Sequence, residues 1–496
     1  MVKACMSFVG SRWFASEPGR ESQRCSAASS SSEGGGFLVR MIGFRDYPVG
    51  PGRIVLFHTR RVEQGAAVPH NSSPVSYNEE VRLTEAVAQR EAGTHASRWS
   101  VSSFESPESL DVNALVFAIE EFVRRHRSLR SEFLLRDGVV HRIILGDNEV
   151  SVTPIDAGHF PAGSDVLRYL EKVFDERADP LRWPGYVFAA ISAETSTTVL
   201  MAFDHIHVDL QSHAIAVHEV ESLYAAHCGR EHANFPPPGN IIESYAAERR
   251  FDRDATDLDE ALEYWTRMVS DGGGALPGFP VDLGLSPKTR LPLRSEESLL
   301  LDADRAGIFD QWCRQNGGTF FSGLLAAAGV AAFRITGKTA FRTIIPMRTR
   351  RDTRGPAVGW LVNGVPIEFD AGSRGLAPVM IDAQAACVAA RRHGHVPFER
   401  ILQLLPATIR REGATWFSYL DFTLFPGAAE HHSRSAAILT CPGAGAGADI
   451  WVNRTHTGVN IHLRYPDATA VRTAIGEYAR TITDVIIAAV ERGPAV

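Results

Sequence analysis

Cysteine is scarce in this sequence and follows no regular spacing. The 496 residues contain six cysteines, and no two of them form a Cys-x-x-Cys pair. Secreted disulfide scaffolds show a regular cysteine framework, so this pattern is typical of a reducing compartment and predicts a cytoplasmic protein. The cysteines are Cys5, Cys25, Cys228, Cys313, Cys387 and Cys441.

Excess positive charge and long apolar runs are missing as well. Lysine and arginine number 51 against 58 aspartates and glutamates, and apart from a cluster at 348–351 the basic residues are scattered, so no nucleic-acid surface is expected. The most apolar run, at 320–333, is too short for a transmembrane segment and predicts a buried helix. Residues 1–36 lack the apolar region of a secretory signal.

Length and local composition predict a tail, two lobes and a linker. A chain of 496 residues exceeds what one hydrophobic core usually spans. Residues 1–36 are small and polar and end in a serine- and glycine-rich run that cannot bury enough apolar area to become ordered, so a disordered tail is predicted at 1–40. Glycine and proline at 272–284 indicate a linker between lobes at 41–271 and 285–496. Strand and helix patterns alternate in both lobes, which predicts a mixed α/β (α+β) fold.

Signatures of two common enzyme classes are absent. The triplet Gly337-Lys338-Thr339 resembles the end of a phosphate-binding loop, but Ala332 occupies the position of the required glycine, and the triplet ends a predicted helix. No Gly-x-Ser-x-Gly elbow is present, so the sequence does not indicate a serine-nucleophile hydrolase.

Polar residues converge at 203–212, where a predicted strand gives way to a helix. Alternation through Met201 and Phe203 would place His205 on the same face, at the strand end. Ser212 is a good N-cap candidate for the following helix. A histidine at such a junction can face a cleft.

Three interpretations of this stretch compete. His205 and Asp209 have the spacing of an His-x-x-x-Asp acyl-transfer motif, in which one residue takes a proton and the other fixes geometry. Alternatively, His205, His207 and Asp209 form a metal site, since two imidazoles and a carboxylate suit zinc. They can also be hydrogen-bonded polar residues at a strand end. The spacing alone leaves all three open.

Several blocks, taken in order, resemble the condensation-domain superfamily of CoA- and carrier-dependent acyltransferases, which includes chloramphenicol acetyltransferase-like enzymes. The resemblance runs from about Pro74 to Tyr465. Its blocks are Pro74-Val75-Ser76-Tyr77, Arg125-His126-Arg127-Ser128-Leu129-Arg130, Asp204-His205-x-x-x-Asp209 and Pro397-Phe398-Glu399. Within the superfamily, three further blocks are most similar to the polyketide-associated acyltransferases of actinobacteria. They are Leu276-Pro277-Gly278-Phe279-Pro280, Pro346-Met347-Arg348-Thr349-Arg350 and Gly359-Trp360-Leu361-Val362-Asn363.

The resemblance implies a fold and a set of partners. The expected fold has two chloramphenicol acetyltransferase-like lobes that meet in a V, as a pseudo-dimer with a tunnel through the interface. The expected reaction moves an acyl group from a thioester to a hydroxyl or amine of a small hydrophobic metabolite. The co-substrate would be acyl-CoA or a phosphopantetheinyl thioester on a carrier protein, and no covalently bound cofactor is implied.

The resemblance also implies roles for individual residues. His205 would be the general base, and Asp209 would be structural, paired with an arginine from the other lobe. Arg350 matches that arginine best, and Arg348 is the fallback. Four residues are expected along the substrate tunnel: Asp204, Ser212, Trp360 and Asn363.

Two departures from the family pattern keep alternatives open. Asp204 stands where many members have a first histidine, and Leu210 replaces the usual glycine after the aspartate. These changes next to the expected base make a catalytically inactive binding module the first alternative. The metal reading also has a named form, because Phe203-Asp204-His205-x-His207 resembles the first-strand motif of amidohydrolases.

Overall fold

The computed structural model describes most of the chain beyond the N-terminal tail. It covers residues 40–491 except for 63–72, 95–96, 137, 231–232, 251–254, 287–288, 351–354, 373–374, 426 and 429–433. The disorder predicted for residues 1–40 therefore concerns residues outside the described part, apart from Arg40. The predicted lobe boundaries stay predictions.

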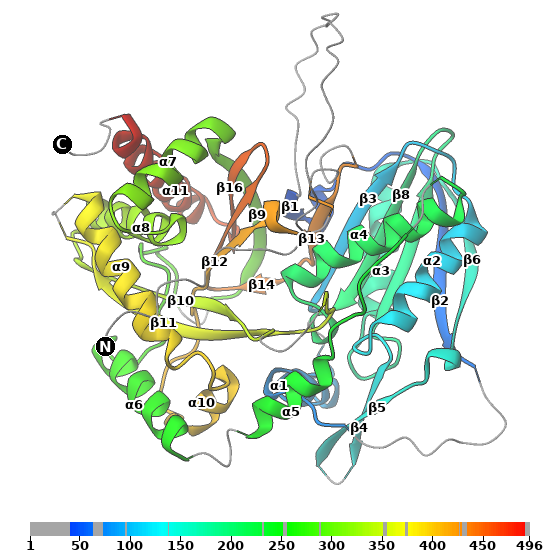
Figure 1. The fold of residues 1–496 in the computed structure, drawn as a ribbon, viewed down its shortest axis with the longest axis horizontal. Coiled ribbons are helices and arrows are strands. Elements are labelled where there is room, and N and C mark those ends of the chain that lie inside the picture. The colour runs from blue at the N-terminus through cyan, green and yellow to red at the C-terminus, as the bar shows by residue number, and fades with distance from the viewer. Residues whose placement is uncertain are drawn as a thin grey trace, which may run out of the picture. The chain divides into compact units, whose positions relative to one another are not determined.

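A mixed sheet dominates the first half of the described chain (Figure 1). Apart from the parallel pair β1–β13, its neighbouring strands are antiparallel. β13 comes from the second half of the chain, so the two halves share this sheet. In spatial order the strands are β1 (Arg40–Gly43), β13 (Ala437–Thr440), β3 (Trp99–Ser106), β8 (Thr197–Asp204), β7 (Tyr186–Ser192), β2 (Gly52–Arg61) and β6 (Val150–Phe160).

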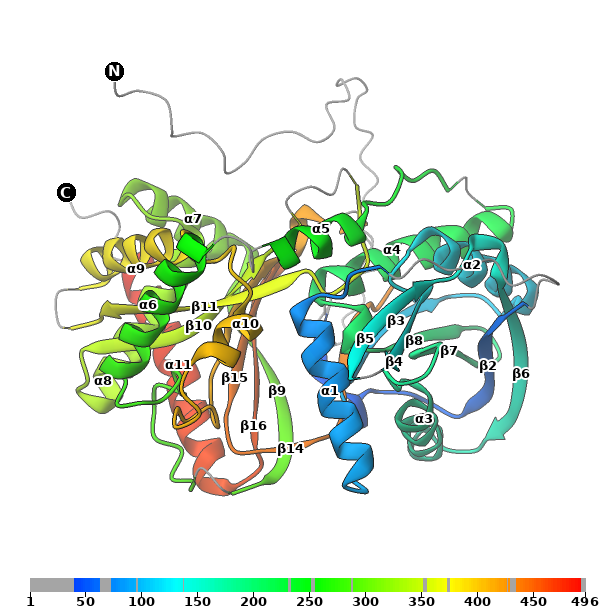
Figure 2. The same cartoon turned by 90° about the horizontal axis from the view of Figure 1, so that it is seen from below.

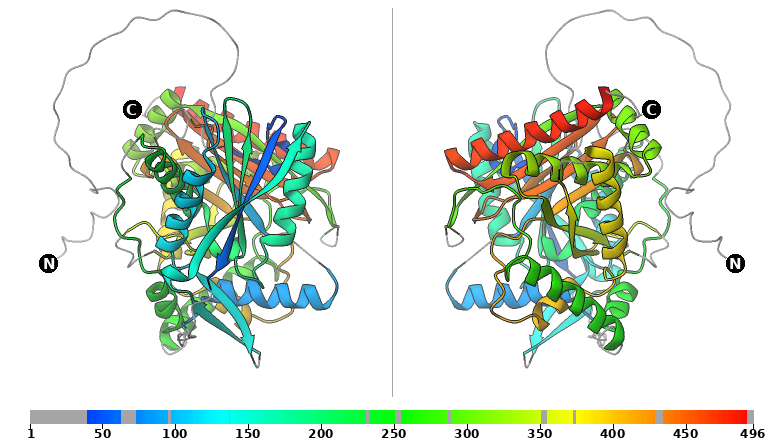
Figure 3. Two further views of the ribbon diagram at one scale, coloured as in Figure 1. Left: turned by 90° about the vertical axis from the view of Figure 1, so that its right-hand side faces the viewer. Right: turned by 90° about the vertical axis from the view of Figure 1, so that its left-hand side faces the viewer.

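Helices cover both faces of this sheet. Helices α2 (Val112–Arg125) and α4 (Leu210–His227) bury their apolar sides against one face, and α3 (Gly163–Arg177) covers the other. The left view of Figure 3 shows α2 and α4 on one side of the strands and α3 on the opposite side. Alternating strand residues feed the two cores, as period-two geometry requires. Phe203 packs toward α4, while Ala202 packs toward α3.

A second sheet carries helices on one face. In spatial order its strands are β12 (Phe417–Asp421), β15 (Asp449–Thr455), β16 (Gly458–Pro466), β9 (Leu291–Asp302) and β14 (Ala444–Gly445). The covering helices are α7 (Ala303–Gln315), α8 (Phe320–Thr336) and α11 (Thr469–Glu491). Figure 3 (right) shows α11 lying along this region. From the sheet, Leu420 and Trp451 pack instead against the core beneath α2 and α4.

The remaining elements include a strand pair and the helix α1, which contacts both halves of the chain. Strands β10 (Ala340–Arg348) and β11 (Val362–Asp370) form an antiparallel pair that packs with α9 (Leu376–Arg391). Helix α1 (Tyr77–Glu91) contacts both α10 (Phe398–Leu404) and the turn η3 (His205–His207), and Figures 1 and 2 place α1 between the two sheets. The other elements are β4 (Ser131–Arg136), β5 (Val139–Ile144), α5 (Ile241–Glu248) and α6 (Ala255–Asp271), with short turns η1 (Phe44–Asp46), η2 (Asp147–Glu149) and η5 (Phe422–Leu424).

The predicted buried helix at 320–333 is confirmed as α8, whose residues are mostly enclosed. It ends at Gly337, whose φ of 72° is the left-handed conformation that glycine adopts most readily, so the triplet 337–339 does terminate a helix. In the described part of the chain, no single helix has the length and apolarity to cross a membrane. Helices α7 and α8 pass that test only as a pair, and the pair is bent by 95°.

Candidate active site around His205

His205 lies in a short turn between β8 and α4. Strand β8 ends at Asp204, whose side chain accepts a hydrogen bond from the Ile206 N–H at 3.0 Å and caps the 3-10 turn η3. His205 therefore follows the strand end directly, as predicted, but it belongs to the turn that the aspartate side chain caps. The His205 N–H still donates to the Arg98 carbonyl, at 3.0 Å, and so ties the turn to β3.

The His205 imidazole is partly exposed and contacts an aromatic ring. Its centroid lies 4.3 Å from that of Trp360, with 38° between the ring planes. Nδ1 is buried, and no other residue in the described part of the chain offers it a hydrogen bond, whereas Nε2 is not enclosed in this way. Burial lowers the pKa of His205 below its usual value, opposed by its own backbone and by Asp204 and Asp209. The geometry therefore presents a neutral imidazole with an available Nε2.

His207, two residues later, is a core residue. It is 2% exposed, its Nδ1 lies 2.9 Å from the Ser128 carbonyl, and its ring packs against Tyr186. Burial lowers its pKa to about 3, so it stays neutral. The sequence places His205 and His207 in similar positions, but only His205 of the two is partly exposed.

The three side chains expected as metal ligands do not form a common site. The His207 ring is engaged with the Ser128 carbonyl, and the Asp209 carboxylate accepts hydrogen bonds from Arg350. Across the residues that the structure describes, no three histidine, cysteine, aspartate or glutamate side chains are grouped as a metal site requires. The arrangement does not assemble the amidohydrolase site that the sequence left open.

Asp209 and Arg350 form a two-pronged ion pair between the halves of the chain. Arg350 Nη1 and Nη2 each lie 2.7 Å from one carboxylate oxygen, with the two side chains 6% and 3% exposed. The carboxylate also accepts the Ser212 N–H at 2.9 Å and the Leu361 N–H at 3.1 Å. Burial acts to raise the pKa of Asp209, but Arg350 and the hydrogen bonds from Ser212 outweigh burial and hold this pKa below its usual value.

Two alternatives at this ion pair are resolved by the contacts. Arg348, the fallback partner, points to Gln211 at 2.6 Å instead. Ser212, the predicted N-cap of α4, is not the cap: Asp209 caps the helix, and Ser212 stands in its first turn. The Ser212 hydroxyl accepts the Gly359 N–H and an Arg350 N–H, each at 3.0 Å. The serine thus joins the ion pair to the loop that carries Trp360.

Two other residues expected along the tunnel are engaged inside the protein. Asp204 is fully buried and paired with Arg82 at 2.6 Å. Burial raises the pKa of Asp204 in spite of that partner. The Asn363 amide donates to the Gly394 and Val396 carbonyls and accepts the Phe398 N–H, all within 2.9 Å. Of the four expected tunnel residues, Trp360 is the one in ring contact with His205.

Sequence reasoning missed several buried supports of the site. Arg82 was not singled out, although its helix begins with the pattern Ser76-x-x-Glu79, which forms a capping box and so marked the start of α1. Arg125 and His126 were singled out only as part of a family block, and both pair with Glu219 on α4, at 3.0 and 2.9 Å. The arginine-rich block therefore braces the helix that follows the histidine motif.

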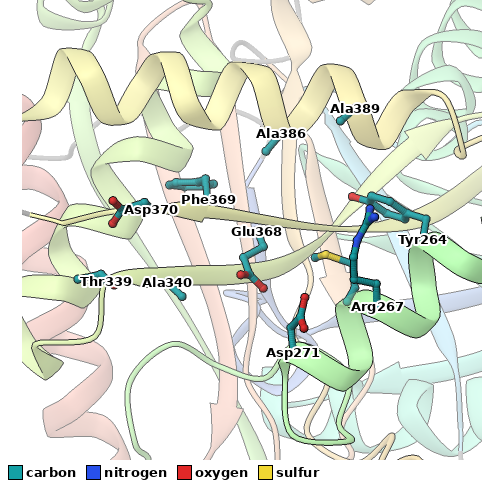
Figure 4. Close-up of a pocket in the computed structure, with 11 residues that line it drawn as sticks. Tyr264, Arg267, Asp271, Thr339, Ala340, Glu368, Phe369, Asp370, Ala386 and Ala389 are labelled. Carbon is teal, nitrogen blue, oxygen red and sulfur yellow. The ribbon is translucent and has the colours of Figure 1, made fainter.

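A separate cavity of about 360 Å³ lies on the second half of the chain (Figure 4). It is bordered by α6, β10, β11 and α9, and in Figure 4 Glu368 and Asp271 approach it from facing elements. None of the predicted site residues lines this cavity, and it contains no histidine. The chemistry proposed for His205 therefore does not involve it.

Comparisons with known proteins agree with this geometry. The family model described as "Condensation domain" matches residues 87–419, about two thirds of the chain. The acyltransferase PapA3 of Mycobacterium tuberculosis (strain CDC 1551 / Oshkosh) is 25% identical over 444 residues, covering 87% of this chain and 92% of its own. The trehalose-2-sulfate acyltransferase PapA2 of Mycobacterium bovis (strain BCG / Pasteur 1173P2) is 25% identical over 455 residues, with 89% and 96% covered.

A solved structure shows that the fold is shared. The structure titled "PapA2 acyl transferase" matches with a TM-score of 0.80 at 20% identity, covering 91% of this chain and 100% of that one. The resemblance predicted from the ordered sequence blocks is confirmed, and so is the mixed α/β fold of the condensation-domain type.

Proposed function

Since the chain belongs to the condensation-domain family and its relatives are acyltransferases, we propose that it transfers an acyl group from a thioester to a hydroxyl group, with His205 as general base. The observation that carries the proposal is the contrast among neighbouring imidazoles. His205 is partly exposed, whereas His207 and His213 are each 2% exposed. His207 has its Nδ1 at the Ser128 carbonyl, and both ring nitrogens of His213 are bonded to serine hydroxyls.

The proposed reaction needs one base and no covalent enzyme intermediate. His205 Nε2 takes the proton of the acceptor hydroxyl as its oxygen bonds to the thioester carbonyl carbon. The carbon–sulfur bond then breaks, and the imidazolium returns the proton to the leaving thiolate. A base must be unprotonated before the reaction, and the lowered pKa of His205 keeps it so at neutral pH.

Asp209 and Arg350 are proposed to position His205 without exchanging protons with substrate. The Asp209 oxygens are filled by donors from Arg350, Ser212 and Leu361. The same ion pair fixes the loop carrying Trp360, whose ring lies against the imidazole. The tunnel implied by the family resemblance would deliver the substrates to this point, and it stays part of the proposal.

The substrates are proposed by class. The donor is acyl-CoA or an acyl chain on the phosphopantetheine arm of a carrier protein, used as a co-substrate. The relative PapA2 is named for trehalose-2-sulfate, which favours a hydroxyl of a sugar or glycolipid over an amine as the acceptor here. We place the reaction in the cytoplasm, and the free thiols of Cys228, Cys313, Cys387 and Cys441 support a reducing compartment.

The proposal is tested by offering purified protein palmitoyl-CoA together with trehalose, trehalose 2-sulfate, a long-chain alcohol or a long-chain amine. Mass spectrometry would detect the acylated product, and a thiol-reactive dye would follow CoA release. We expect an ester product with at least one hydroxyl acceptor. If none of these pairs gives product while palmitoyl-CoA binds tightly, the chain is a binding module that has kept the fold without the chemistry.

A further inference from the structure

A third histidine of the motif region, His213, is held between two serines of β3. Its Nδ1 lies 2.6 Å from Ser102 Oγ, and its Nε2 lies 2.7 Å from Ser100 Oγ. His213 is 2% exposed and Ser102 is fully buried, whereas Ser100 is only partly buried. The three side chains form a hydrogen-bonded row with one accessible end, at Ser100.

The direction of the hydrogen bonds follows from counting donors and acceptors. Burial lowers the pKa of His213 to about 3, so its ring is neutral and has one donor and one acceptor nitrogen. In the described part of the chain the Ser102 hydroxyl has no other partner, and a buried hydroxyl hydrogen without an acceptor is costly. Ser102 therefore donates to Nδ1, and Nε2–H donates to Ser100 Oγ.

This direction determines what Ser100 can do. Its oxygen already accepts a hydrogen bond from His213, so its own hydrogen is left to donate elsewhere. The nitrogen that could remove a proton from Ser100 instead carries one, so the row does not activate Ser100 as a nucleophile. Ser100 is thus a directed hydrogen-bond donor at a partly exposed position.

Ser100 lies close to the turn that carries His205. In the β3–β8 register Ser100 faces Phe203, and the His205 N–H bonds to the carbonyl of Arg98, two residues before Ser100. His205 follows β8 directly, and its imidazole lies near enough to the His213 ring to help lower the pKa of His213. His213 also stands in the first turn of the helix that Asp209 caps. A reacting group held at His205 would therefore lie within reach of the Ser100 hydroxyl.

We propose that Ser100 binds substrate by donating a hydrogen bond to an oxygen that can only accept one, the carbonyl oxygen of the acyl thioester. His213 and Ser102 are positioning residues that direct the Ser100 hydrogen. This inference rests on the proposed function, because it assigns a partner to the acyl donor at the same site. The acceptor hydroxyl gives its proton to His205, so the carbonyl oxygen is the group that needs a donor.

A set of variants tests the row through kinetics with palmitoyl-CoA and trehalose. Ser100→Ala should lower kcat/KM about three- to tenfold, the usual effect of one uncharged hydrogen bond. His213→Leu should cause a similar loss, and the double variant should lose no more than either alone. His213→Gln should restore activity, because the amide offers an acceptor oxygen and a donor N–H. Ser103→Ala, on the same strand with its hydroxyl on the Ala437 carbonyl, is the matched control and should match wild type.

Two kinetic results would overturn the proposal. One is a Ser100→Ala variant with wild-type kcat/KM. The other is a double variant in which the two losses multiply, because His213 would then act independently of Ser100. Thermal unfolding of each variant separates these outcomes from simple loss of folded protein.

A second measurement tests the row without turnover. Nitrogen-15 NMR of histidine-labelled protein, with His213→Gln to assign the signal, reports which ring nitrogen carries the hydrogen. We expect the Nε2–H form, and an Nδ1–H form would overturn the assignment. If wild type makes no acylated product while His213 shows the Nε2–H form, the proposed function fails and the hydrogen-bonded row stands.

Discussion

Two buried aspartate–arginine pairs flank His205, and they differ in what they join. Asp204 and Arg82 lie 2.6 Å apart, and both belong to the first half of the chain. Asp209 and Arg350 lie 2.7 Å apart and connect the start of α4 to the loop after β10. The first pair supports the turn from within its own core, and the second ties that turn to the other half.

The pKa values of the two carboxylates are shifted in opposite directions. Burial raises the pKa of Asp204 although Arg82 opposes it, whereas at Asp209 burial is outweighed and the pKa falls. Asp209 receives two guanidinium N–H groups and two backbone N–H groups from both halves. An ion pair built this way holds a specific geometry, and it is the one in contact with the loop of Trp360.

The largest effect is expected from breaking the pair between the halves. Arg350→Ala leaves a buried carboxylate and Asp209→Ala leaves a buried guanidinium, so each should cost about 3–5 kcal/mol in the free energy of unfolding. Denaturant unfolding measures this loss. Because the residues form one unit, the double variant should lose much less than the sum of the single losses. Purely additive losses would show that the pair contributes nothing as a pair and would leave Asp209 available for a chemical role.

Breaking the inner pair should affect stability more than chemistry. Arg82→Leu leaves Asp204 buried without its partner and should also cost about 3–5 kcal/mol. Per folded molecule, its kcat/KM should fall less than that of Arg350→Ala, since the loop carrying Trp360 keeps its anchor on Asp209. Activity assays corrected for the folded fraction compare the two. Equal losses of activity would mean that the pairs are equivalent.

The buried imidazoles near these pairs predict a smaller, pH-dependent effect. His207 and His213 have pKa values near 3 in the fold, against about 6.5 in the unfolded chain. The unfolded state binds more protons between those values, so each histidine stabilises the fold above pH 6.5 and loses that contribution as the pH falls. At pH 5 the loss is about 2 kcal/mol per imidazole.

The variant His213→Gln isolates this contribution. Buried acids such as Glu399, whose pKa is raised to about 7, change stability in the opposite sense, so the informative quantity is the difference between two proteins. Between pH 7 and pH 5 the wild type should lose about 2 kcal/mol more stability than His213→Gln. Parallel profiles would show that His213 is not buried in its neutral form.

The smallest effect is expected at Leu210, where the family usually has glycine. Leu210 is the first residue of α4, and the glycine-only region of positive φ is not used there. Leu210→Gly should therefore gain no activity and should cost at most about 1 kcal/mol through backbone entropy. Thermal unfolding and kcat/KM of this variant check both statements. A marked gain of activity would revive the view that the leucine impairs the site.

The local features of this site could be predicted from the sequence, but its long-range contacts could not. The apolar alternation of β8 and the helical spacing of α4 were readable because each depends on neighbours in the chain. Asp209 and Ser212 are both good caps, and the sequence could not show that Asp204 starts a turn that shifts the cap to Asp209. The pairing with Arg350 came from the family resemblance.

Residues engaged with distant partners could not be identified in advance. Asp204 pairs with Arg82 across 122 positions, and His213 meets Ser100 across 113. Asn363 is occupied largely by backbone carbonyls, which leave no signature in the sequence. From the sequence alone, Asp204 and Asn363 could therefore be expected to contact substrate, although in the fold both are bonded to distant parts of the chain.

The role of His205 as general base is tested most directly by the kcat/KM of His205→Ala with palmitoyl-CoA and the best hydroxyl acceptor, alongside circular dichroism and thermal unfolding. A general base contributes at least about 100-fold to the rate. We expect a loss of that size or more in a protein that unfolds as the wild type does. A folded His205→Ala variant with full acyl-transfer activity would contradict it.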